Sequence, residues 1–200
     1  MIKFLDILKE SDDNIFIPRG SKEEKDKVLT KKDYDKIQEY IRNGSEGDLI
    51  LMYSQIEKLP DNFTVNGTLD LQRCKNLQSL PNGLKVTYDL DLRRTNITSL
   101  PSDLEVGRDL ILMHSQIEKL PDNLTVNGNL DLDGCKNLQS LPNGLKVKNN
   151  LHLRDTNITS LPSDLEVGGD LALYRTPIAN RYTKEQIREM VPGVKGGIYL

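Results

Sequence analysis

Pairs of leucines, each with one residue between its members, recur along most of this chain at intervals of about 20 residues. Within each Leu-x-Leu the two leucines fall on one side of an extended chain and the middle residue on the other, which is typical of a strand. The seven pairs are Leu49/Leu51, Leu69/Leu71, Leu90/Leu92, Leu110/Leu112, Leu130/Leu132, Leu151/Leu153 and Leu171/Leu173. This short fixed period predicts a solenoid of about seven turns whose strands stack into one parallel β-sheet.

The opposite wall of the solenoid is predicted to be extended or polyproline-like, without regular helices. Each unit places a Leu-Pro after its first strand, and proline disfavours a helix interior. The prolines are Pro60, Pro81, Pro101, Pro121, Pro142 and Pro162. A second apolar doublet follows, as in Phe63/Val65, and predicts another brief strand. Four glycines are then expected to provide the bend back to the next unit: Gly67, Gly107, Gly128 and Gly168.

A solenoid exposes apolar surface at both ends, so each end needs a cap. The pattern predicts an N-terminal helical cap in residues 1–46, seven repeats in 47–176 and a C-terminal cap in 177–200. Residues 31–43 read as a helix with Thr30 as N-cap, which would close the first turn with one apolar face. That face consists of Tyr34, Ile37 and Ile41.

The first residues, with Met1, Phe4, Leu5 and Leu8, have the spacing of a short amphipathic helix. At the other end Thr183 and Gln186 predict a capping box for a helix through about Val191. Residues 196–200 then predict a strand on the exposed edge of the sheet. A docking tail is the alternative for either end, and the caps are favoured on physical grounds.

A small residue stands five positions after the first leucine of every unit. The residues are Ser54, Cys74, Thr95, Ser115, Cys135, Thr156 and Thr176. The unit resembles the leucine-rich repeat, whose motif places an inward asparagine or cysteine there to bond the backbone. Because Ser and Thr replace the usual asparagine, a ladder of hydroxyl groups bonded to the backbone is expected.

The Leu-Pro of each unit further resembles the short bacterial type of this repeat, found in effectors that pathogens secrete. The lysine-rich start and the closing Val-Pro-Gly-Val-Lys-Gly-Gly-Ile-Tyr-Leu look like uncharacterised leucine-rich repeat proteins of tailed phages and their hosts. These resemblances imply a binding module, phage-encoded and directed at a host protein.

The amino-acid composition argues against nucleic acid and membranes as partners. The 200 residues carry a net charge of −3, so the basic field that non-specific nucleic-acid binding needs is lacking. No signal peptide and no apolar stretch of membrane-spanning length is recognisable, which predicts a soluble cytoplasmic monomer. Cys74 and Cys135 lie three turns apart, too far for a disulfide, and are expected as buried thiols.

No catalytic motif is recognisable, and neither a metal nor another cofactor is predicted. His114 and His152 fall at outward positions on different turns, where solvated side chains are the common case. Asp131 and Asp133 share one strand face and could serve a hydrolase or a cation. We favour an ordinary polar face, because an exposed flat sheet gives carboxylates little desolvation.

Residues 48–107 recur at 109–168 with about fifty of sixty positions identical, so the chain can be compared with itself. The differences are Tyr53/His114, Phe63/Leu124, Thr68/Asn129, Gln72/Asp133, Arg73/Gly134, Thr87/Lys148, Tyr88/Asn149, Asp89/Asn150, Asp91/His152 and Arg94/Asp155. Five lie at outward positions within or just after the Leu-x-Leu strands, and four immediately precede a strand. This clustering favours a recognition surface over neutral drift.

The sequence therefore predicts a non-enzymatic module that binds a protein or peptide through its strand face. Arg73, Arg93 and Arg94 could grip an acidic peptide by bidentate pairing with carboxylates. The alternative is a structural or assembly component of a phage particle that self-associates. The predicted binding residues are Tyr53, Gln72, Arg73, Arg93, Arg94, His114, Asp133, Arg154, Asp155, Tyr174 and Arg175.

Overall fold

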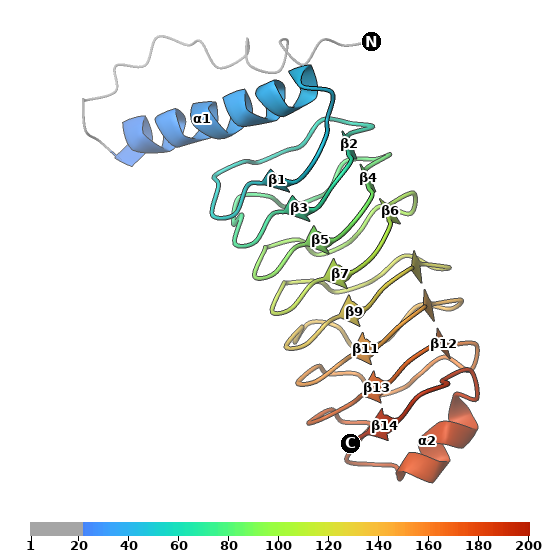
Figure 1. Ribbon diagram of the computed structural model, residues 1–200. Coiled ribbons are helices and arrows are strands. Elements are labelled where there is room, and N and C mark those ends of the chain that lie inside the picture. Colours follow the sequence, from blue (N-terminus) through green and yellow to red (C-terminus); the bar gives the residue numbers. More distant parts are fainter. Residues whose placement is uncertain (1–21) are drawn as a thin grey trace.

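The chain forms an elongated parallel β-solenoid with one helix near each end (Figure 1). The computed structural model describes the fold of residues 22–200, with side chains from residue 31 onward. The amphipathic helix predicted around Met1, Phe4, Leu5 and Leu8 lies outside the described residues. About six complete turns of the chain connect the seven Leu-x-Leu strands, and leucines occupy the same positions in each turn.

All seven predicted strands stack side by side in one parallel sheet. The leading leucines are in register from turn to turn, as in Leu49 opposite Leu69 and Leu110 opposite Leu130. The strands are β1 (Leu49–Ile50), β3 (Leu69–Asp70), β5 (Leu90–Asp91), β7 (Leu110–Ile111), β9 (Leu130–Asp131), β11 (Leu151–His152) and β13 (Leu171–Ala172). Residues at the same position of each unit therefore form straight rows along the solenoid axis.

The opposite wall is extended, and its second apolar doublets form brief strands as predicted. One three-stranded sheet contains β2 (Thr64–Val65), β4 (Lys85–Val86) and β6 (Glu105–Val106). A second contains β8 (Thr125–Val126), β10 (Lys146–Val147) and β12 (Glu166–Val167). The interruption falls between β6 and β8, where the two copies of the duplicated block meet. Each copy thus carries its own back sheet.

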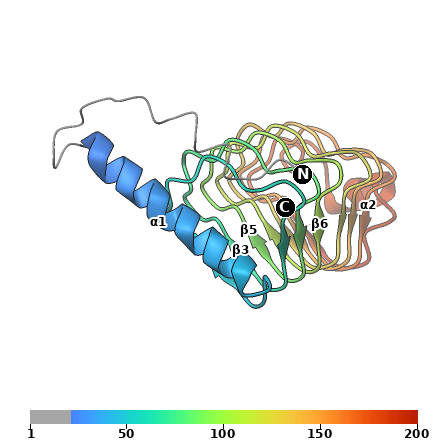
Figure 2. The ribbon, with the colours of Figure 1, turned by 90° about the horizontal axis from the view of Figure 1, so that it is seen from above.

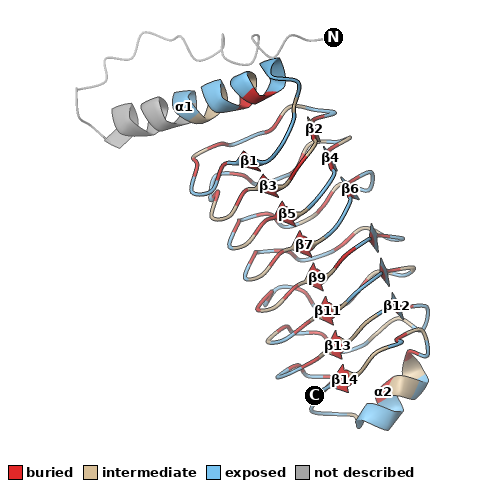
Figure 3. Ribbon diagram, viewed as in Figure 1, coloured by how far each residue is buried: buried red, intermediate tan, exposed pale blue. Residues whose placement is uncertain are grey.

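The interior is a continuous stack of leucine, isoleucine and valine, shown red in Figure 3. The predicted hydroxyl ladder is present: Thr95, Thr156 and Thr176 each donate to a leucine carbonyl three residues earlier, at 2.7–2.8 Å. The thiols of Cys74 and Cys135 instead donate to a leucine carbonyl in the preceding turn, at 3.1 Å. Both cysteines are free and buried, and burial raises the pKa of Cys135 to about 11.

The glycines at the bends have a different role from the one expected. Gly107 and Gly168 are not in the left-handed region that favours glycine. A β-carbon at either position would lie 2.0 Å from a carbonyl oxygen of the preceding turn, that of Thr87 or Lys148. Close approach of successive backbones, rather than bending freedom, therefore excludes a side chain at these positions.

A second ladder runs along the edge where the chain enters the strands. The carboxylates of Asp48, Asp109 and Asp170 each accept a backbone N–H from the next turn, at 2.7–2.8 Å. One of these aspartates stands at the start of each copy and the third just after the second copy, so a whole block separates each from the next. The same hydrogen bond therefore recurs at the start of each block and again just after the second.

Helix α1 (Lys22–Arg42) covers the first turn, as Figures 1 and 2 show. It begins well before the predicted start, so Thr30 lies inside the helix and is not its N-cap. Ile37 is buried as expected, whereas Ile41 is exposed and Tyr40 is buried in its place. The Tyr40 ring packs edge-on against Phe63 with centroids 6.2 Å apart, since Tyr40 is the residue that faces the first turn.

Side chains of α1 also form hydrogen bonds with backbone groups at and next to the first turn. Lys36 donates to the carbonyl of Ile50, and the Asp33 carboxylate accepts the backbone N–H of Gln55 at 3.0 Å. The Tyr40 hydroxyl donates to the carbonyl of Ser45. The helix therefore protects polar backbone groups that would otherwise offer an edge for pairing.

The C-terminal cap forms as predicted. Thr183 and Gln186 make the capping box of α2 (Lys184–Met190), and β14 (Ile198–Tyr199) pairs in parallel with β13. Ile187 is fully buried, and Arg188 donates to the carbonyls of Val194 and Gly196 at 2.5 and 2.6 Å. Apolar and polar contacts together close the last turn.

Candidate partner-binding surface

All eleven predicted binding residues fall in two adjacent rows beside the strands. We call the first the face row, formed by the residue after each Leu-x-Leu: Met52, Gln72, Arg93, Met113, Asp133, Arg154 and Tyr174. We call the second the corner row, formed by the next residue of each turn: Tyr53, Arg73, Arg94, His114, Gly134, Asp155 and Arg175. Because the strands are parallel and in register, neighbouring members of a row stand one strand spacing apart, about 4.8 Å.

Every corner-row residue has a left-handed backbone. Six of the seven are not glycine, and their φ angles lie between 56° and 62°. In each turn the next N–H donates to the carbonyl of the second leucine, as in Ser54 N to Leu51 O at 3.0 Å. This tight turn forces the left-handed conformation, which costs a residue with a β-carbon roughly 1–2 kcal/mol. This geometry was not predicted from the sequence, although the glycine at position 134, which is equivalent to Arg73 in the second copy, was a signal for it.

The back wall provides an internal comparison. Its left-handed positions are occupied by Asn62, Asn123, Gly83 and Gly144, residue types that adopt this conformation at little cost. The corner row instead carries tyrosine and arginine in four of its turns. The chain therefore retains large side chains at the corners where smaller residues would be less strained.

The first half of the corner row is basic. Arg73 donates to the Tyr53 hydroxyl at 2.9 Å and lies over its ring, 5.1 Å from the centroid. Within residues 31–200 the Arg94 guanidinium has neither a hydrogen bond nor an ion pair. Arg73, Arg94, Lys75 and His114 line an open pocket of about 570 Å³, which we call the basic pocket.

Arg93 does not join this group. Its guanidinium makes a bidentate contact with Asp91 at 2.5–3.0 Å, and Asp91 is only 5% exposed. The hydrogen bonds to Asp91 raise the pKa of Arg93 above its usual value. Of the three arginines predicted to bind an acidic peptide, Arg73 and Arg94 are therefore the two that make neither a hydrogen bond nor an ion pair with a carboxylate among residues 31–200. The signal was available, because residues 91 and 93 share one face of a strand.

In the second half of the two rows, the charged side chains pair mainly with one another. Arg175 donates to the Asp155 carboxylate at 2.6 Å, and Arg154 lies 3.5 Å from it. Asp133 is half-buried, and burial, followed by the nearby charge of Asp131, raises its pKa. The expectation that an exposed face gives these carboxylates little desolvation is thus wrong for Asp133, because burial is the main cause of its raised pKa. The Asp133 carboxylate also accepts the Arg154 N–H of the next turn at 2.8 Å, which lowers the pKa in part.

Not every difference between the copies belongs to this surface. Asp89 and Asn150 occupy the same position before a strand, and the side-chain oxygen of each accepts the backbone N–H of the next turn, at 3.0 and 2.8 Å. This pair of residues serves the edge ladder in both copies. The differences at the corners have no such shared structural role. Where the first copy has tyrosine the second has histidine, and where the first has arginine the second has glycine or aspartate.

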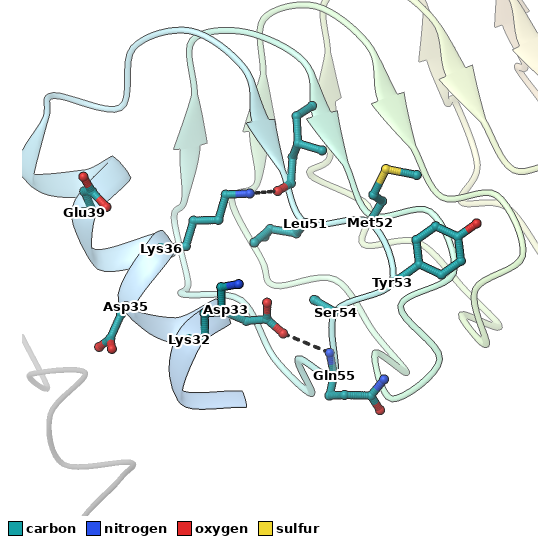
Figure 4. Close-up of a pocket in the computed structure, with 11 residues that line it drawn as sticks. Lys32, Asp33, Asp35, Lys36, Glu39, Leu51, Met52, Tyr53, Ser54 and Gln55 are labelled. Atoms are coloured by element: carbon teal, nitrogen blue, oxygen red, sulfur yellow. Dashed lines mark hydrogen bonds between the residues drawn. The ribbon is translucent and has the colours of Figure 1, made fainter. Parts of the chain in front are cut away.

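A second pocket, of about 620 Å³, lies between α1 and the first turn (Figure 4). We call it the helix-side pocket. Ile50, Met52 and Tyr53 line it and are 38–54% exposed, which is high for large apolar side chains. Asp33 and Lys36 reach across from the helix to the chain opposite. The sequence could not locate this pocket because it depends on where α1 lies.

No protein-family model, curated protein or solved structure matches this chain. Within residues 22–200, neither helix has the length and apolar character needed to span a bilayer. Among residues 31–200, whose side chains the structure describes, no three His, Cys, Asp or Glu side chains are placed to hold a metal ion together.

Proposed function

We propose that this protein is a non-enzymatic binding module of the leucine-rich repeat type, which captures a protein or peptide along its face and corner rows. The observation that carries the proposal is the left-handed corner row, in which strained arginine and tyrosine side chains replace residues that fit the turn better. Strained backbone of this kind concentrates at functional sites. Tyrosine and arginine are also the side chains most enriched at binding hot spots.

Further features agree with this reading. The helix-side pocket offers exposed apolar side chains next to the basic pocket, so an anchor and a charged contact are available together. Two free, buried thiols suit a reducing compartment such as a bacterial cytoplasm. The proposed setting is a phage-infected host cell, with a host protein as partner.

The Arg94→Gly variant tests the argument from strain. Glycine adopts the left-handed conformation without the steric cost that arginine has there. It loses more conformational entropy on folding, but this second effect is smaller, so the free energy of unfolding should rise by about 0.5–1 kcal/mol. It should also bind less tightly to peptides selected from a random library on the full chain. The free energy of unfolding and the dissociation constant are measured together.

Arg108→Gly is the matched control, because Arg108 is exposed and outside the left-handed region. This variant should lose a little stability and keep its peptide affinity. The proposal fails if Arg94→Gly binds the selected peptides as tightly as the parent, or if Arg108→Gly is weakened to the same degree.

Self-association in a particle is the second candidate, and one observation favours it. Among the described strands β14 pairs with β13 alone, so its outer side is an open edge. The binding proposal predicts a sedimentation coefficient that does not change with protein concentration. A coefficient that rises steadily with concentration would favour assembly through this edge.

A further inference from the structure

The basic pocket has more positively charged side chains than are needed to pair with a single carboxylate. Its lining residues are Arg73, Lys75, Arg94 and His114, and none of them is acidic. Asp91, the buried carboxylate on the nearby strand, is engaged by Arg93, and among residues 31–200 the four lining residues make no ion pair. Arg73, Lys75 and Arg94 line one pocket, so their positive charges repel one another, and a strongly anionic ligand would relieve that repulsion.

The shape of the cluster favours a phosphoryl group over a carboxylate. A carboxylate has two oxygens in one plane, which a single bidentate arginine satisfies. A phosphoryl group has three oxygens and a charge of about −1.5 to −2 at pH 7, so it can accept from several donors at once. Arg73 and Arg94 stand on adjacent turns and can approach one such group from two sides, with Lys75 beside them.

The helix-side pocket lies along the same row at a defined distance. Tyr53 belongs to this pocket and touches Arg73, which belongs to the basic pocket, so the two are continuous. From the strand of Met52 to that of Arg94 is two strand spacings, about 10 Å, which an extended peptide covers in about three residues. One peptide lying along the solenoid axis can therefore reach both.

We infer that the first half of the corner row binds an extended peptide with a phosphorylated side chain in the basic pocket and an apolar side chain, about three residues away, in the helix-side pocket. The inference rests on the proposed function and names the ligand chemistry of the same surface. The phosphopeptide is preferred to free phosphate because the apolar pocket next to the anion site would otherwise be unused.

Three degenerate peptide libraries test it, with a fixed central phosphoserine, aspartate or serine, each applied to the full chain. We expect the phosphoserine library to be retained about tenfold more than the aspartate library, since it carries about twice the charge. Apolar residues should be enriched about three positions from the phosphoserine. Arg94→Ala should abolish the preference, whereas Lys119→Ala on the back wall should preserve it.

Equal retention of the phosphoserine and aspartate libraries would overturn the inference. So would inorganic pyrophosphate or a single-stranded oligonucleotide that binds as tightly as the retained phosphopeptides. The proposed function can fail separately, because it is judged on unphosphorylated random peptides and on Arg94→Gly. If those peptides depend on Arg94 while the libraries show no preference for phosphate, only this inference is wrong.

Discussion

Reversing two charges in the basic pocket, with Arg73→Glu and Arg94→Glu, is expected to abolish peptide capture. Each change replaces attraction for an anionic partner by repulsion, and together they should weaken affinity at least about 100-fold, since like charges brought together cost several kcal/mol. Thermal stability should hardly change, because neither guanidinium is buried. The contact of Arg73 with the Tyr53 ring contributes only about 0.5–1 kcal/mol at such a site. Fluorescence anisotropy with a selected peptide and thermal unfolding measure both quantities.

The control is Lys58→Glu with Lys119→Glu, which makes the same change of net charge on the back wall. Both lysines are exposed, and they occupy equivalent positions in the two copies. The control should bind nearly as well as the parent. If the arginine double variant binds as well as the parent, the basic pocket is not part of the binding site. If the control loses affinity equally, the effect comes from the net charge of the protein and not from the pocket.

The C-terminal cap should be indispensable for stability. Removing residues 181–200 deletes four buried apolar side chains, Ile187, Val191, Val194 and Ile198, and uncovers the leucines of the last turn. Each buried side chain of this size contributes about 1.5–3 kcal/mol, so the loss approaches the whole stability of an ordinary domain. We expect the truncated chain to lose its cooperative thermal transition and to associate through the exposed β13 edge, seen by circular dichroism and sedimentation.

A point variant keeps the experiment informative if the truncated chain does not fold. Ile187→Ala should cost about 2–5 kcal/mol, because Ile187 is fully buried between α2 and the last turn. Glu189→Ala, on the exposed side of the same helix, should be nearly neutral. If Ile187→Ala unfolds at the same temperature as Glu189→Ala, the cap does not stabilise the solenoid.

The solenoid could be predicted from sequence because its determinants are local and repeated. Leu-x-Leu sets the strand, and Leu-Pro excludes a helix in the wall behind it. The N-terminal helix could not be bounded in this way. Thr30 looks like an N-cap, yet lysine and glutamate on both sides are strong helix formers and the helix continues through it. Which apolar residue faces the first turn, Tyr40 or Ile41, depends on how the helix lies against it.

For the candidate site, comparing the copies pointed to the face and corner rows but not to the conformation or partners of their side chains. Outward positions follow from strand periodicity, so all eleven residues were located. The left-handed corners were not foreseen because tyrosine and arginine rarely adopt that conformation. The ion pair of Asp155 with Arg175 depends on side-chain geometry between neighbouring turns, which a repeat pattern does not specify.

The edge ladder makes the length of the molecule adjustable. Asp48, Asp109 and Asp170 offer the same carboxylate acceptor at intervals of one whole block, and the back sheet is interrupted where the two copies join. A further block spliced in after Asp109 would meet the same acceptor on each side and would lengthen the strand face by three spacings, about 14 Å. Tandem copying of one coding segment could thus lengthen the solenoid while both caps stay unchanged.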